Sequence, residues 1–144
     1  MLDIEQMASI RIVIVDDHEL ARRGLRSVLA NNPDLQVIAE IASGEEAVQR
    51  VGELHPDIIL LDITLPKMSG IEAASSIHRE SPNSRVIFVS QHDSVLLAKD
   101  AMRAGGSAYV VKSDAGRDLL SAIAAVQEGK TFVSRSLRVR GWNS

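Results

Sequence analysis

The sequence predicts a doubly wound α/β fold, in which helices cover both faces of a five-stranded parallel sheet. Short apolar runs alternate along the chain with longer segments whose apolar residues recur at helical spacing. The run at residues 58–61, Ile-Ile-Leu-Leu, has no polar alternation, which is typical of a strand buried on both faces. A helix between two successive strands acts as a crossover, and crossovers require parallel pairing with right-handed connections.

The first two strand–helix repeats are expected between residues 10 and 54. A strand at 10–15 precedes a helix that begins near Glu19, and Asn-Asn-Pro at 31–33 ends that helix. Its inward face is expected to carry Leu20, Leu25, Val28 and Leu29. A strand at 36–41 then leads into Ser-Gly-Glu-Glu at 43–46, a capping-box pattern that opens the next helix, with Glu46 reaching back to the first backbone amide.

Three further repeats follow in the same order. Strands are expected at 57–61, 85–89 and 107–111, and a second capping box at 69–72 opens a helix that reaches about residue 80. Asp93 or Ser94 is expected to cap the fourth helix, and Ser113 or Asp114 the fifth, which reaches about residue 128. Periodicity alone does not determine strand order, but 2-1-3-4-5 is the common arrangement and places strands 1 and 3 side by side.

The composition is that of one ordinary folded domain and excludes several classes of protein. The 144 residues suffice for a core, and 45% of them are hydrophobic and 24% charged. A net charge of -3 offers no basic surface for nucleic acid, and the absence of cysteine excludes disulfides and cysteine-ligated zinc. No apolar run approaches the roughly 20 residues that span a bilayer, and residues 1–7 lack the pattern of a secretory signal. We therefore expect a cytoplasmic protein with no membrane partner.

The chain is expected to have three segments: an N-terminal extension at 1–9, one domain at 10–129, and a C-terminal tail or truncated linker at 130–144. The tail carries three late arginines and is too short to form a DNA-binding domain. It suggests a basic linker or a solvated end. Whether an output domain was removed or never existed is left open by the sequence.

Polar residues follow the expected strands at the point where each strand ends. Asp16 and Asp17 follow the first strand, Asp62 the third, Ser90 the fourth and Lys112 the fifth. The carboxyl ends of parallel strands meet at one edge of the sheet, where ligand sites form. Three carboxylates in one crevice repel one another, so one ammonium group and a divalent cation such as Mg²⁺ are expected to neutralise them. A carboxylate beside such an ion can attack a phosphoryl group and form an acyl phosphate.

Each of these residues also has an ordinary structural explanation. A single aspartate after a strand is most often a helix N-cap, and a single Ser90 or Lys112 is most often a turn residue or a solvated strand end. His18 and His92 also lie near strand ends, but lone histidines are usually structural or solvated, and these two make a poor zinc site. The conjunction of four strand ends in an order that one sheet can bring together favours a site.

Four motifs in this order resemble the receiver domain of two-component response regulators, over residues 10–128. They are Val-Asp-Asp at 15–17, Leu-Leu-Asp-Ile-Thr-Leu-Pro-Lys-Met-Ser-Gly at 60–70, Phe-Val-Ser at 88–90 and Tyr-Val-Val-Lys at 109–112. The stretches at 16–25 and 43–47 look most like the LuxR/FixJ-type subfamily, whose receivers precede a helix-turn-helix output domain. The resemblance implies a flavodoxin-like fold and a phosphorelay signalling domain rather than an enzyme.

The resemblance also implies a role for each polar residue. Asp62 would accept a phosphoryl group from a sensor histidine kinase or a phosphotransfer protein. Asp16 and Asp17 would hold Mg²⁺ together with Asp62 and the backbone carbonyl of Thr64. A homodimer could form on phosphorylation, and transcription regulation would belong to an output domain absent from this chain.

Three further residues would transmit the signal. Lys112 would pair with the phosphoryl group and with Asp62, and Ser90 would donate its hydroxyl to a phosphoryl oxygen. Tyr109 stands at the position of the family's switch aromatic and would turn inward into the space that Ser90 vacates. A half-buried strand aromatic is the ordinary alternative for Tyr109.

The chain departs from the family pattern at two positions. Ser113 follows Lys112 where the family usually has a cis proline, so a cis bond is not expected there. Gln91 stands where a small residue is common, and its larger side chain would restrict access to the phosphoryl group.

Two other functions fit these residues less well than a receiver domain does. A phosphohydrolase of the haloacid dehalogenase type would need an acidic residue two positions after the nucleophile, where this chain has Thr64, and its nucleophile would follow strand 1. A receiver-like domain that binds partners without phosphorylation would not need an acidic residue at every site position. This chain has one at each, which weakens that alternative.

Overall fold

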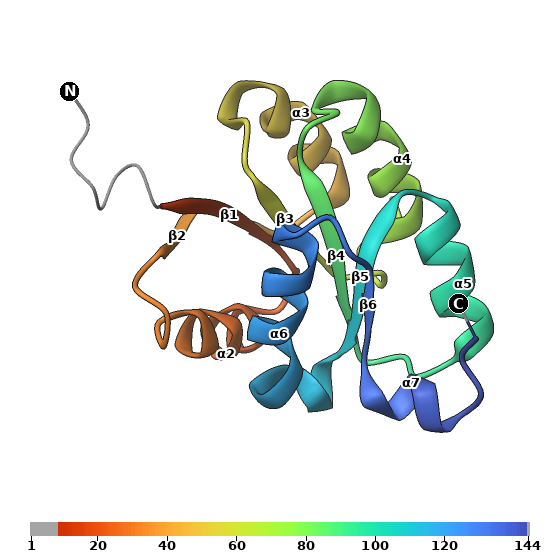
Figure 1. The fold of residues 1–144 in the computed structure, drawn as a ribbon. Coiled ribbons are helices and arrows are strands. Elements are labelled where there is room, and N and C mark those ends of the chain that lie inside the picture. Colours follow the sequence, from red (N-terminus) through yellow and green to blue (C-terminus); the bar gives the residue numbers. More distant parts are fainter. Residues whose placement is uncertain (1–8, 144) are drawn as a thin grey trace.

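Six parallel strands form one sheet in the order β2-β1-β3-β4-β5-β6 (Figure 1). The computed structural model describes residues 9–143, so all of the expected N-terminal extension except Ser9 lies outside the described residues. The strands are β1 (Ile10–Val15), β2 (Leu35–Ile41), β3 (Ile58–Leu61), β4 (Arg85–Ser90), β5 (Gly106–Val111) and β6 (Phe132–Val133). The expected order of the first five strands is confirmed, and the expected number is corrected from five to six.

Helices cover both faces of this sheet, as the sequence predicted (Figure 1). They are α2 (Glu19–Leu29), α3 (Gly44–Leu54), α4 (Gly70–Glu80), α5 (Val95–Arg103), α6 (Ala115–Gln127) and α7 (Arg135–Val139). Alternate residues of β1 enter different cores, because Ile12 and Ile14 pack with α2 and α6 whereas Val13 and Val15 pack with α3 and α4. This two-sided burial explains the apolar runs. Among the described residues, no helix is both long and apolar enough to cross a membrane.

Serine side chains cap three helices at the carboxyl edge of the sheet. The hydroxyls of Ser43, Ser69 and Ser94 each accept a backbone N–H bond at 3.2 Å, which satisfies an otherwise unpaired amide of the first turn. Ser94 rather than Asp93 therefore caps α5. The expected return contact of Glu46 is not formed, because its carboxylate pairs instead with Arg50, one turn further along α3, at 3.1 Å.

The expected inward face of α2 is wrong at one residue. Leu25 and Leu29 are buried, whereas Leu20 is 78% exposed. A helix turns about 100° per residue, so Leu20 lies about 140° around the axis from Leu25. Leu20 therefore lies outside the buried face of α2 that contains Leu25 and Leu29.

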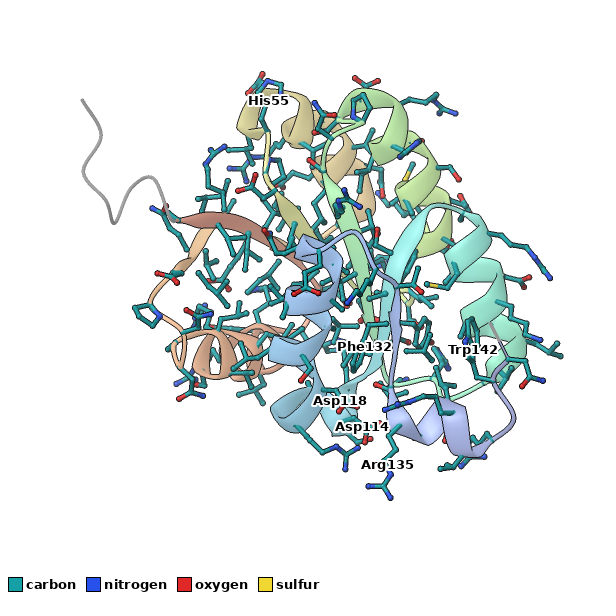
Figure 2. All side chains as sticks on the ribbon, viewed as in Figure 1. His55, Asp114, Asp118, Phe132, Arg135 and Trp142 are labelled. Carbon is teal, nitrogen blue, oxygen red and sulfur yellow. The ribbon has the colours of Figure 1, made fainter. Side chains whose placement is uncertain are left out.

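The C-terminal segment is packed on the domain instead of forming a free tail. Leu137 of α7 and Ser134 are fully buried, and Trp142 packs against the core formed by α3, α4 and α5. Figure 2 shows Phe132 at β6 beside β5, Arg135 at the start of α7 and Trp142 beside α5. The Ser136 hydroxyl donates to Asp114 at 2.6 Å, so one of the two residues expected to cap α6 instead contacts α7, and its side chain makes no cap hydrogen bond. We propose that the domain boundary lies beyond α7 instead of at residue 129.

Ser134 fixes the sixth strand through two bonds to β5. Its backbone amide donates to the Tyr109 carbonyl at 2.9 Å, and its hydroxyl accepts from the Val111 amide at 2.9 Å. A two-residue strand in a polar segment gives no periodic signal, because its pairing depends on this contact with a distant residue.

Replacement of Ser134 should destabilise the domain. The variant Ser134→Ala leaves the buried Val111 amide without a partner, which costs about 1–3 kcal/mol of the free energy of unfolding. Urea denaturation followed by far-UV circular dichroism measures this loss. Ser75→Ala, at an exposed position of α4, is the matched control and should change stability by less than about 0.5 kcal/mol. Equal stabilities for the two variants would contradict the role of Ser134.

Candidate phosphoacceptor and metal site

The carboxyl ends of β1, β3 and β5 bring three charged side chains into contact. Lys112 Nζ lies 2.7 Å from Asp16 Oδ2 and 3.0 Å from Asp62 Oδ2. The two carboxyl side chains are only 1% and 4% exposed, and the lysine side chain is 25% exposed. The strand order places β1 and β3 side by side, which is why residues 46 positions apart in the sequence meet here. The sequence indicated this meeting but not the contact between Lys112 and Asp16.

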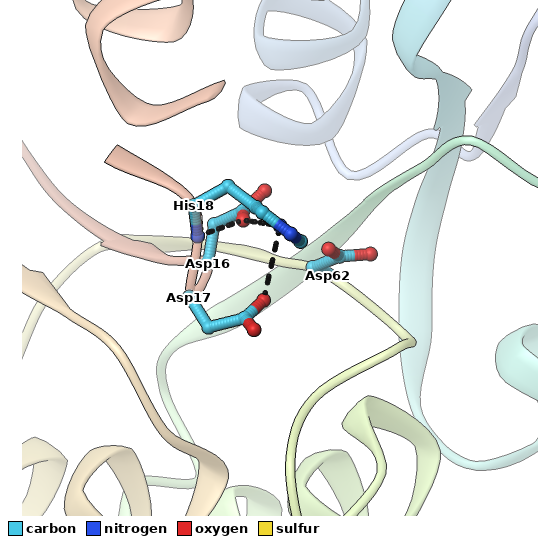
Figure 3. A group of neighbouring side chains, drawn as sticks. All are labelled: Asp16, Asp17, His18 and Asp62. Atoms are coloured by element: carbon cyan, nitrogen blue, oxygen red, sulfur yellow. Dashed lines mark hydrogen bonds and ion pairs between the residues drawn. The ribbon is translucent and has the colours of Figure 1, made fainter. Parts of the chain in front are cut away.

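Asp17 and His18 complete an acidic cluster next to this ion pair (Figure 3). His18 Nδ1 lies 3.2 Å from Asp17 Oδ1 and 3.4 Å from Asp16 Oδ1. Asp16, Asp17, His18 and Asp62 each offer one ligand atom, and these atoms lie within 4.8 Å of one another. Asp17 Oδ1 is buried and accepts no hydrogen bond, and the His18 imidazole 3.2 Å away is its polar neighbour, so this oxygen could bind a cation if His18 moved aside.

The electrostatic state of the ion pair follows from burial and from the charge imbalance. Burial is the largest influence on Asp62 and raises the pKa of its carboxyl above 3.8; Lys112 lowers it and the charge of Asp16 raises it further. Burial by itself would lower the pKa of Lys112, but hydrogen bonds and charges from Asp16 and Asp62 together raise it above 10.5. Lys112 is therefore held as a cation, while ionised Asp62 is costly and would gain from a second positive charge.

Ser90 ends β4, Tyr109 lies within the neighbouring β5, and both side chains are completely buried. The Ser90 hydroxyl accepts a bond from the His92 amide at 3.1 Å, and the Tyr109 hydroxyl donates to the His92 carbonyl at 2.8 Å. The ring of Tyr109 also packs against Phe88, with 6.3 Å between ring centroids. Tyr109 is thus inside the domain in this structure, and it is fully buried instead of half-buried; its inward turn on phosphorylation stays a prediction. Burial raises the pKa of its hydroxyl above 10.0.

The loop after Asp62 contacts the loop after Ser90. The Thr64 hydroxyl lies 2.8 Å from His92 Nε2, and the Thr64 amide donates to Asp62 Oδ1 over 3.4 Å. The contacts of His18 with Asp17 and of His92 with Thr64 are not predicted from the sequence, because a lone histidine near a strand end is usually structural or solvated. The only hint in the sequence is that both histidines lie near strand ends. Gln91 is exposed, and the described residues contain no cis peptide bond, so the loop after Lys112 has a trans backbone.

Gly70 lets the start of α4 pack directly on the backbone of Asp62. Its amide donates to the Ile63 carbonyl at 2.7 Å. A Cβ atom at this position would lie 2.0 Å from the carbonyl oxygen of Asp62. Any side chain at Gly70 would therefore displace the backbone that carries Asp62.

This geometry belongs to a known class of signalling domain. Residues 12–124 match the family model of the response regulator receiver domain, and the chain belongs to this family. It is 36% identical over 124 residues to the transcriptional regulatory protein DegU of Brevibacillus brevis, covering 86% of this chain and 52% of that protein. It is 31% identical over 132 residues to the response regulator protein VraR of Staphylococcus aureus (strain Mu3 / ATCC 700698), covering 92% of this chain and 63% of that protein.

A solved structure agrees with these relatives. A two-component response regulator of the LuxR family from Aurantimonas sp. SI85-9A1 superposes with a TM-score of 0.86 at 35% identity, covering 91% of this chain and 94% of that one. The chain is therefore a receiver domain of a two-component response regulator, with relatives of the LuxR type. It spans between 52% and 63% of the length of the curated relatives it matches.

Removal of the ammonium group should raise the pKa of Asp62 further. In Lys112→Met the lowering effect of Lys112 is lost, while burial and the charge of Asp16 continue to raise the pKa. Carbon-detected NMR titration of aspartate carboxyl groups measures the change. Lys130→Met, at an exposed lysine paired with Glu128, is the control and should leave the Asp62 titration unchanged.

The same titration fixes the direction of the pH dependence. Because the pKa of folded Asp62 is above 3.8, the protonated carboxyl favours the folded state. That contribution is present at low pH and is lost as pH rises from about 3.8 through the folded-state pKa. A lower Asp62 pKa in Lys112→Met than in the wild type would contradict this account of the site.

Proposed function

We propose that this domain accepts a phosphoryl group on Asp62 from a sensor histidine kinase or a phosphotransfer protein. The single observation that supports this most directly is the buried Asp62 carboxylate, which lies 3.0 Å from the Lys112 ammonium beside a second acidic pair. In the reaction an O–P bond would form at Asp62 as the N–P bond of a phosphohistidine breaks. Lys112 would then bind a phosphoryl oxygen and offset the added negative charge.

Asp16, Asp17 and Asp62 would hold Mg²⁺, together with the backbone carbonyl of Thr64. Three carboxylates face one ammonium group here, and Asp17 Oδ1 is buried and accepts no hydrogen bond, with the His18 imidazole 3.2 Å away. The residues present therefore fit a hard divalent cation. When bound, the ion would supply positive charge to the phosphoryl oxygens. Lys112 would keep Asp16 oriented, since it contacts both Asp16 and Asp62.

Ser90 and Tyr109 would transmit the change to the surface. A serine hydroxyl has one proton to donate and two lone pairs that accept. Ser90 Oγ accepts from the His92 amide, so its proton stays available for a phosphoryl oxygen while that bond persists. Phosphorylation would then favour the arrangement in which Tyr109 is buried over arrangements in which its hydroxyl leaves His92.

A phosphoacceptor role fits these residues better than a phosphohydrolase. The position two residues after Asp62 holds Thr64, whose hydroxyl contacts His92 and is not an acid. Asp62 also follows β3, and not the first strand as in the haloacid dehalogenase type. We further propose that phosphorylation promotes a homodimer and that transcription regulation depends on an output domain like that of the LuxR-type relatives.

Incubation with acetyl phosphate and Mg²⁺ should add one phosphoryl group per chain, on Asp62. Intact-mass spectrometry under mild acid conditions detects the adduct. Asp62→Asn should remain unmodified because an amide is a poor nucleophile. Asp34→Asn, at an exposed loop position, is the matched control and should be labelled at the wild-type rate. Labelling of Asp62→Asn at the wild-type rate would show that Asp62 is not the phosphoacceptor.

Mg²⁺ should bind weakly, since most of its ligands would be water molecules. Asp17→Asn should weaken binding by at least tenfold, because removal of one of a few protein carboxylates costs about 1.4 kcal/mol or more. Amide chemical shifts of residues 16–17 and 62–64 report the titration. Unchanged affinity in Asp17→Asn, with Asp34→Asn as control, would show that Asp17 is not a ligand.

A further inference from the structure

His92 connects three parts of the domain that are far apart in the sequence. Its backbone amide donates to Ser90 Oγ at 3.1 Å, and its carbonyl accepts from the Tyr109 hydroxyl at 2.8 Å. Its imidazole Nε2 lies 2.8 Å from Thr64 Oγ1. Only the contact with Thr64 depends on the side chain. A substitution at His92 can therefore remove that contact while both backbone groups keep their capacity to bond.

The contact with Thr64 joins two loops that flank the proposed acceptor. Thr64 lies two residues after Asp62 and donates its amide to Asp62 Oδ1 over 3.4 Å. His92 lies in the segment 91–94 between β4 and α5, which has no helical or strand structure. The side-chain bridge therefore fixes a segment that lacks regular backbone bonding of its own.

The segment 91–94 also contacts the buried Tyr109, through the His92 carbonyl. The Tyr109 side chain is completely enclosed, and a buried hydroxyl needs a partner for its proton. The carbonyl that accepts this proton belongs to His92. Displacement of segment 91–94 would remove this acceptor, so the position of the segment and the burial of Tyr109 are linked.

We propose that His92 is a positioning residue, whose hydrogen bond to Thr64 holds segment 91–94 in the arrangement that keeps Tyr109 buried. Through this bond the loop that carries Asp62 and the ring of Tyr109 influence each other. The effect on the conformation of Tyr109 stands without any chemistry at Asp62. The effect on signalling rests on the proposed function.

Tyr109 is the only tyrosine in the chain, so one fluorine label reports its position. With 3-fluorotyrosine incorporated, the ¹⁹F spectrum and relaxation dispersion measure the populations of buried and exposed rings. His92→Leu and Thr64→Val should each lower the buried-to-exposed ratio by roughly fivefold, the factor for one ordinary hydrogen bond. His92→Gln carries an amide that can reach Thr64 Oγ1, and it should keep the wild-type spectrum.

A double-mutant cycle separates positioning from simple packing. If the two side chains act through one bond, the double variant His92→Leu/Thr64→Val should lower the ratio no more than either single change. His78→Leu, at an exposed position of α4, is the matched control and should leave the spectrum unchanged. Additive effects, or wild-type spectra for both single variants, would overturn the proposal.

Acetyl phosphate labelling of the same proteins separates this inference from the proposed function. If the inference holds, His92→Leu and Thr64→Val label more slowly than His92→Gln, and the double variant is no slower than either. If wild-type Asp62 is not labelled, the proposed function fails while the fluorine cycle still decides the role of His92. If Asp62 is labelled but the fluorine spectra of the two variants match the wild type, the role of His92 fails and the proposed function stands.

Discussion

The ammonium group of Lys112 lies between two buried carboxylates, and the geometry of the site depends on that contact. Asp16 and Asp62 lose most of their hydration, and their charges repel each other. Lys112 reaches both oxygens, at 2.7 and 3.0 Å, only because β1, β3 and β5 end at the same edge of the sheet. Removal of Lys112 would leave both carboxylates buried without this ammonium partner, which is destabilising. The site is thus a consequence of the strand order in the sheet.

One ammonium group is not sufficient for three carboxylates, and this imbalance gives the site its chemistry. Burial, and to a smaller extent the charge of Asp16, raises the pKa of Asp62, and Asp17 Oδ1 accepts no hydrogen bond although His18 Nδ1 lies 3.2 Å away. A divalent cation would offset the repulsion between the carboxylates. A phosphoryl group on Asp62 would then lie between this cation and the ammonium group of Lys112. Close packing keeps the acceptor in place, since Gly70 brings the start of α4 against the backbone of Asp62.

The last segment of the chain borders the strand that carries two functional residues. β5 holds Tyr109 and leads directly to Lys112, and Ser134 bonds to the backbone of β5 at Tyr109 and at Val111. Asp93, the neighbour of His92, also pairs with Arg140 at 2.9 Å, although both groups are largely exposed and the pair contributes little. Because Ser134 bonds directly to β5, a rearrangement around Tyr109 would directly affect the C-terminal segment.

The sequence by itself determined the alternation of strands and helices, and the strand ends at which Asp16, Asp17, Asp62, Ser90 and Lys112 lie. Local signals carry this information, because apolar runs, serine caps and helix-ending residues act over a few positions. The order of the strands was expected only as the common arrangement of this fold class, and the tertiary structure established it. The tertiary structure alone decided the sixth strand, the outward position of Leu20, the burial of Tyr109 and the contacts of His18 and His92. Each of these depends on groups brought together from distant parts of the chain, and no local pattern encodes such a distance.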